Sequence, residues 1–167
     1  LYKIMGQYAK AEPLYVRALA IFEKAFGPEH PKIAAILDNL ATLYDSTGQY
    51  AKAEPLNVRA LAIREKALGP EHTGTATSLN NLAMLYQDMG QYTKAEPMYV
   101  RALAICEKAC YPTRTATHLS NLATLYDSTG QYAKAEPLYV RALAIREKAL
   151  GPEHPDTAIS VNNLAFL

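Results

Sequence analysis

Histidine and cysteine are the residues of this 167-residue chain whose chemistry first suggests a site. His30, His72 and His154 each follow a Gly-Pro-Glu tripeptide. Imidazoles share a metal ion only when their nitrogens all lie about 2 Å from one centre. Because these three belong to separate copies of a repeat, we expect them along one edge, too far apart for that. The pattern favours histidines that support a helix start or a loop.

The two cysteines lie four residues apart on one predicted helix. That spacing rarely permits an unstrained disulfide, and two thiols alone make an incomplete zinc site. We expect Cys110 to be a small buried hydrophobe and Cys106 an exposed thiol. His118 interrupts the repeat pattern, and we expect it to be partly exposed. Its position is held in the other repeats by Ile36, Ser78 and Ser160.

The carboxylates do not suggest an active site. No phosphate-binding glycine loop, nucleophile elbow or paired-histidine metal motif occurs in the sequence. One acidic position recurs with the repeat, which is typical of a solvated helix face; it is held by Glu12, Glu54, Glu96 and Glu136. The sequence therefore predicts a protein that is not an enzyme, with no catalytic residue, cofactor or metal.

An internal repeat organises the chain and would position these side chains. The tripeptide Gly-Gln-Tyr occurs at spacings of 42, 42 and 40 residues, beginning at Gly6, Gly48, Gly90 and Gly130. A fixed period of this length predicts stacked supersecondary units. The last interval is two residues short, and the deficit falls in a loop near Cys110–Thr115.

Within one unit, residues 31–69, the pattern predicts two helices of about 16 and 19 residues. Pro31 suits a first helical position, and apolar residues then recur at a spacing of three to four. Gly48 ends the first helix, and Gly69-Pro70 closes the second. Pro55 lies one turn inside the second helix, which we expect to continue past it with a mild kink.

The residues at fixed positions within the unit resemble the tetratricopeptide-repeat signature. The stretch 80–109 and the longer period are similar to the repeats of kinesin light chains and their bacterial relatives. The resemblance covers all 167 residues and implies an all-α, right-handed superhelical solenoid of antiparallel helix pairs with a concave peptide-binding groove. The signature residues in the second unit are Ala41, Tyr44, Gly48, Tyr50, Ala53 and Ala60.

We therefore expect residues 1–167 to form a single array. Large residues such as Leu40, Tyr44 and Tyr50 would fill the space between neighbouring helices, and Leu82 should be buried. The predicted units are 1–27 (partial), 31–69, 73–110, 114–151 and 155–167 (partial).

The groove of such an array would be lined by the first helices, whose remaining face is polar. One column of four asparagines would either pair with the backbone of an extended peptide or bond neighbouring helices together. The predicted groove residues are Asp38, Asn39, Thr42, Asp45, Asn80, Asn81, Met84, Gln87, Asp88, Ser120, Asn121, Thr124, Asp127, Asn162 and Asn163.

Charge predicts the kind of partner. Kinesin light chains, adaptors between a motor and its cargo, recognise acidic cargo peptides with basic groove residues. The matching positions here hold Asp, Asn, Ser and Thr, so we expect an interaction scaffold that prefers neutral or basic segments.

Composition excludes other classes. Half of the residues are apolar and the formal net charge is +1, which gives no electrostatic footprint for nucleic acid or an anionic membrane. No apolar run is long enough to cross a bilayer, and the two cysteines favour a reducing, cytoplasmic compartment.

The ends of the sequence leave two further interpretations open. Both fall midway through a predicted first helix, so we expect a piece of a longer array with apolar surface at its ends. Such ends could join copies head to tail in a self-assembling repeat, or the array could regulate a larger signalling protein. The head-to-tail contact would place Ile159, Leu164 and Phe166 against Tyr8, Ala11 and Tyr15 of another copy.

Overall fold

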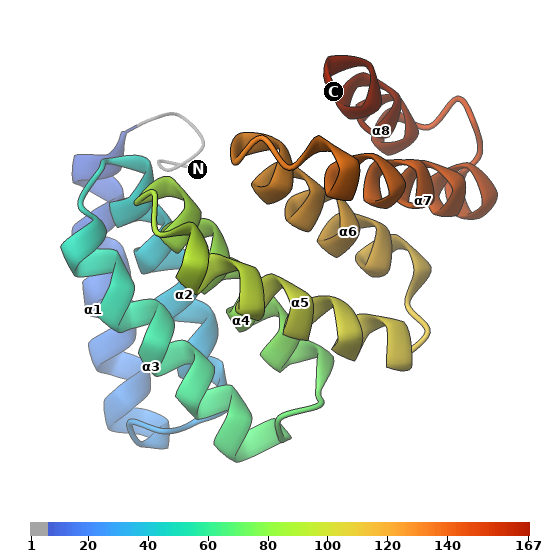
Figure 1. Ribbon diagram of the computed structural model, residues 1–167. Coiled ribbons are helices and arrows are strands. Elements are labelled where there is room, and N and C mark those ends of the chain that lie inside the picture. Colours follow the sequence, from blue (N-terminus) through green and yellow to red (C-terminus); the bar gives the residue numbers. More distant parts are fainter. Residues whose placement is uncertain (1–6) are drawn as a thin grey trace. The chain divides into compact units, whose positions relative to one another are not determined.

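A computed structural model describes residues 7–167, and this part of the chain consists of eight α-helices joined by short loops. The predictions for residues 1–6, including the first part of the partial unit 1–27, lie outside the described residues. Figure 1 shows the helices running in sequential antiparallel pairs. Their bounds are α1 Tyr8–Phe26, α2 Pro31–Ser46, α3 Tyr50–Leu68, α4 Thr73–Asp88, α5 Tyr92–Lys108, α6 Pro112–Ser128, α7 Tyr132–Leu150 and α8 Pro155–Phe166.

The helix boundaries follow from local chemistry. Pro31 occupies the first turn of α2, where no backbone N–H is needed. Gly48 ends that helix at φ 70°, and the N–H of Gln49 donates to the carbonyl of Tyr44 at 2.8 Å. This 6→1 bond is a Schellman closure, which needs a residue with positive φ and favours glycine.

The prolines inside the second helices do not break them. Pro55 is the sixth residue of the 19-residue α3, and Pro137 holds the same place in α7. Helical packing on both sides of the proline outweighs the single lost backbone bond. The expectation of continuous helices is confirmed.

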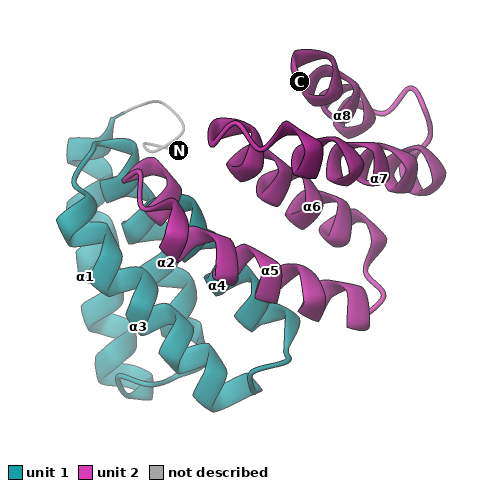
Figure 2. Cartoon of the chain, viewed as in Figure 1, with its two compact units in different colours: residues 1–85 teal, residues 86–167 magenta. Residues whose placement is uncertain are grey.

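The chain divides into two compact units, residues 1–85 and residues 86–167 (Figure 2). In the first unit, α2 packs between α1 and α3 around Ile33, Leu37 and Ile63. In the second, α6 packs between α5 and α7, and α8 packs on α7. Tyr139 of α7 lies there against Ala123 of α6.

Small residues let the paired helices approach closely, as the repeat signature predicts. Ala41 on α2 and Ala53 on α3 are both fully buried. Leu40 and Tyr44 are buried beside them, Tyr50 is half-buried, and Leu82 on α4 is 2% exposed. These buried residues form the core that holds the paired helices together.

Candidate peptide-binding surface

The predicted groove residues lie on α2, α4, α6 and α8, but one position on each of α2, α4 and α6 is buried. Asp38, Asn80 and Ser120 are 9% exposed or less, so the prediction that they line an open surface is wrong for them. Asp38 makes an ion pair with Arg64 at 2.5 Å. Its charge is therefore compensated inside the protein and is not available to repel peptide carboxylates.

The remaining predicted residues retain contact with solvent. Met84 presents an apolar side chain, 44% exposed, at the position where α2 and α6 carry threonine. The exposed members are Asn39, Thr42, Met84, Asp88 and Asn162. The half-buried members are Asp45, Asn81, Gln87, Asn121, Thr124, Asp127 and Asn163.

Several of these polar groups also stabilise their own hairpin. The hydroxyl of Thr42 donates to the backbone carbonyl of Asp38 at 2.7 Å. In the second unit, the hydroxyls of Thr124 and Tyr139 lie 2.9 Å apart, and Tyr99 donates to the side-chain oxygen of Gln87 at 3.0 Å. Gln87 and Thr124 are therefore held by tyrosines of the second helices, whereas Thr42 is held by its own helix.

Carboxylates mark the C-terminal ends of the first helices. Burial raises the pKa of Asp88, which lies at the last position of α4. In the second unit, burial raises the pKa of Tyr139, the hydrogen bond with Thr124 acts against this, and the negative charge of Asp127 adds to the rise. A negative charge at a helix C-terminus is unfavourable because that end of the helix dipole is also negative. A positively charged side chain of a bound partner would therefore be stabilised there.

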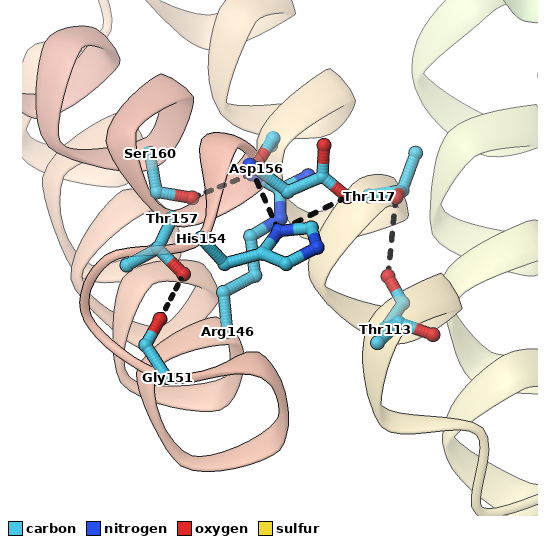
Figure 3. A network of polar contacts seen from close by, with 9 residues as sticks. Thr113, Thr117, Arg146, Gly151, His154, Asp156, Thr157 and Ser160 are labelled. Atoms are coloured by element: carbon cyan, nitrogen blue, oxygen red, sulfur yellow. Dashed lines mark hydrogen bonds and ion pairs between the residues drawn. The ribbon is translucent and has the colours of Figure 1, made fainter.

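A buried layer of charged and polar side chains was missed by the sequence reasoning. Arg146 of α7 is only 8% exposed, and it donates to the hydroxyl of Ser160 at 2.5 Å (Figure 3). It also donates to the hydroxyl of Ser120 at 3.4 Å. Arg64 of α3 likewise donates to Ser78. The recurring pairing of arginine with serine 14 residues later was the pattern that could have revealed this layer.

The same layer corrects the expectations for His118 and the two cysteines. Cys106 occupies the position of Arg64 and Arg146 and is 1% exposed, so the prediction of an exposed thiol is wrong. His118 replaces the serine and is 7% exposed, not partly exposed as predicted. Burial, followed by the positive charge of Arg114, lowers the pKa of His118 to about 4.

Cys110 is exposed, also contrary to expectation. The shortened loop ends α5 at Lys108, two residues before the point at which α3 and α7 end. Cys110 then takes φ 55°, the only non-glycine with positive φ among residues 7–167, and Tyr111 bonds back to the carbonyl of Cys106. The left-handed closure turns the thiol away from the core.

The recurring glutamates are structural as well as partly solvated. The phenol of Tyr44 donates to Glu12 at 2.8 Å, and Tyr126 donates to Glu96 at the same distance. Burial and these glutamates raise the pKa of both phenols, that of Tyr126 to about 12. The interpretation of this column as a purely solvated face is therefore wrong.

The three loop histidines support helix starts, as predicted. Nδ1 of His30 accepts from the backbone N–H of Lys32, and His154 accepts from Asp156 (Figure 3). His72 accepts in the same way from Gly74 at 2.9 Å. Over residues 7–167, no group of three or more His, Cys, Asp or Glu side chains is placed to hold a metal ion.

The comparisons with known proteins agree with this architecture. Two tetratricopeptide-repeat family models match the chain, one over residues 1–66 and 47–108 and the other over residues 115–156. No curated protein sequence matches it. Among the described helices, none is long and apolar enough to cross a membrane.

Solved structures of kinesin-light-chain type are similar over almost the whole chain. BtubC (BKLC) from P. vanneervenii is 31% identical with a TM-score of 0.84, and the match covers 99% of this chain and 66% of that one. A kinesin light chain-type protein of Podosopora anserina with nearly identical TPR-like repeats is 32% identical with a TM-score of 0.82. That match covers 99% of this chain and 79% of the other. The chain thus spans just under two thirds of the first relative and about four fifths of the second.

Proposed function

Because this chain belongs to the tetratricopeptide-repeat family and is similar to kinesin-light-chain-type proteins, we propose that it is a non-enzymatic scaffold that binds an extended peptide segment. Tetratricopeptide repeats generally mediate protein interactions. The peptide would lie against the solvent-facing side of α2 and α4 in one unit, or of α6 and α8 in the other. Each face offers amides that can donate and accept with a peptide backbone.

The single observation that supports this proposal most is that every asparagine of the column keeps contact with solvent. Asn39 is exposed and Asn81, Asn121 and Asn163 are half-buried, one on each first helix. The alternative, that these asparagines hydrogen-bond neighbouring helices to each other, is compatible with the half-burial of Asn81, Asn121 and Asn163.

The proposed partner is a neutral or basic segment. Asp45, Asp88 and Asp127 remain partly or fully exposed at the helix C-termini, where a basic side chain would offset both the carboxylate and the helix dipole. With Asp38 neutralised by Arg64, the preference would depend on these three positions.

Fluorescence anisotropy with three peptide series on one backbone, bearing Lys, Gln or Glu, tests this proposal. We expect the Lys series to bind most tightly, with an advantage that falls as salt rises. Asp88→Asn combined with Asp127→Asn should weaken Lys peptides several-fold and leave Gln peptides unchanged. Asp156→Asn, which removes an exposed carboxylate at the start of α8, is the matched control. Tighter binding of the Glu series that the combined Asp88→Asn and Asp127→Asn change alters would refute the charge preference of this face, and absence of binding by all three would refute the peptide surface.

Self-association is a second candidate function, favoured by the apolar exposure of α8. Phe166 is 80% exposed and Ile159 is 53% exposed. The head-to-tail contact predicted from the sequence needs one correction, because Ala11 is 4% exposed and packs inside its own unit. Light scattering over a concentration series, with Phe166→Ser as the variant, distinguishes this function: a monomer at all concentrations would refute it.

A further inference from the structure

A cavity of about 470 Å³ opens in the second unit beside the shortened loop between α5 and α6. Its floor and walls are largely apolar, with Tyr111 from the loop and Ile145 from α7. Arg141 and Lys148 of α7 bring two positive charges to it, and the thiol of Cys110 also lines it. This surface involves the loop and the second helices, so it is distinct from the proposed peptide face of the first helices.

The first unit contains the equivalent cavity, and the lysine of that cavity already forms an ion pair within the protein. A space of about 310 Å³ lies between the α1–α2 loop and α3, lined by Arg59, Ile63 and Lys66. These residues hold the same repeat positions as Arg141, Ile145 and Lys148. Glu29, from the Gly-Pro-Glu-His loop, enters this space and pairs with Lys66.

The arginine beside each cavity is paired in the same way. Arg59 contacts Glu23 at 2.6 Å, and Arg141 contacts Glu107 at 2.7 Å. Arg59 also donates to the loop carbonyl of Pro28 at 2.8 Å, a bond to the Gly-Pro-Glu-His loop. The two sites therefore share the arginine–glutamate ion pair and differ in what the loop supplies to the arginine and to the lysine.

The shortened loop explains that difference. It runs Cys-Tyr-Pro-Thr-Arg and lacks the Glu-His pair of the other loops. Among residues 7–167, Lys148 has no ion pair or hydrogen bond from its side chain. The N-cap of α6, Tyr111, also makes no side-chain bond, whereas His30 caps α2. The deletion has removed both an anion and a helix cap, and it has left a larger cavity.

We propose that this cavity binds an acidic peptide segment of a partner protein, with a carboxylate on Lys148 and a neighbouring apolar side chain against Tyr111 and Ile145. The carboxylate would take the place that Glu29 takes beside Lys66. The charge balance favours an acidic ligand, because Glu107 offsets only Arg141, and Arg114 adds a further positive charge over the Tyr111 ring. An exposed ion pair alone is weak, so apolar contact in the cavity supplies much of the affinity.

Cys110 provides a native reporter of occupancy. It is exposed in the cavity while Cys106 is buried, so iodoacetamide should alkylate Cys110 selectively, as measured by mass spectrometry of the peptide that contains it. The probes are two blocked tetrapeptides, Ala-Leu-Glu-Ala and Ala-Leu-Gln-Ala, which differ only in the charge. We expect the Glu peptide to slow alkylation several-fold, and the Gln peptide to need a concentration at least about three times higher for the same effect.

Two lysine variants make the test specific. Lys148→Glu should raise the concentration of Glu peptide needed for protection about tenfold, whereas Lys66→Glu, the equivalent exposed change in the other unit, should leave it unaltered. Insertion of Glu-His between Pro112 and Thr113 should slow alkylation without any peptide. Equal protection by both peptides, no protection by either, or an equal effect of the two lysine variants would overturn the proposal. Circular dichroism confirms that each variant is folded.

Discussion

The burial of His118 makes a quantitative prediction about stability and pH. The side chain is 7% exposed, and the loss of hydration together with the nearby Arg114 lowers its pKa from 6.5 to about 4. Between these two values the unfolded chain binds a proton at this histidine and the folded chain does not. The free energy of unfolding therefore contains a contribution that is complete above pH 6.5 and is lost as pH falls towards 4. At about 1.4 kcal/mol per pKa unit, the loss is about 3 kcal/mol.

Replacement by a neutral side chain isolates this contribution. His118→Gln keeps a polar group of similar size but removes the titration, and the three loop histidines are the same in both proteins. Urea unfolding at intervals from pH 7.5 to pH 4 should show that the native protein loses about 3 kcal/mol more than the variant. Parallel pH profiles for the two proteins would show that His118 is solvated and that the buried layer is wrongly placed.

Three further substitutions test other parts of the structure. Leu82→Ala should cost about 2–5 kcal/mol in urea unfolding because the side chain is 2% exposed, and a cost below 1 kcal/mol would contradict that burial. Ser120→Asp should give Arg146 the carboxylate partner that its equivalent already has, and should stabilise the protein by about 1–3 kcal/mol; an unchanged thermal midpoint would argue against an uncompensated charge there. Tyr126→Phe should cost about 0.5–1.5 kcal/mol and remove one phenol of pKa about 12 from the alkaline absorbance titration, and an unaltered titration would refute the bond to Glu96.

The helices could be predicted because their boundaries depend on residues close in sequence. Pro31 and Gly48 set the ends of α2 through backbone geometry that does not depend on any other helix. The apolar stripe then identified Leu82 as a core residue. The loop histidines were also predictable, since a helix start needs only an acceptor two residues before the backbone N–H that it caps.

The buried polar layer could not be predicted in this way, because it depends on which face of a second helix meets the next hairpin. An arginine at a repeated position is ordinarily expected in solvent, and that expectation placed Cys106 outside as well. The long arginine side chain instead lies inside and satisfies its donors on serine hydroxyls. The error over Cys110 has a different cause, since two deleted residues ended α5 early and moved this residue out of the helix.

The residues of this buried layer vary together between otherwise near-identical hairpins. Where the second helix carries a large arginine, the following first helix carries a small serine, as in Arg146 with Ser160. Where it carries the small Cys106, the following helix carries the larger His118, so the total side-chain volume changes little. A hairpin paired out of order would place arginine against His118, or cysteine against serine, leaving a clash and an unpaired charge or a void. The layer thus distinguishes the Cys106–His118 junction from the arginine–serine junctions, which the repeated surface residues cannot do.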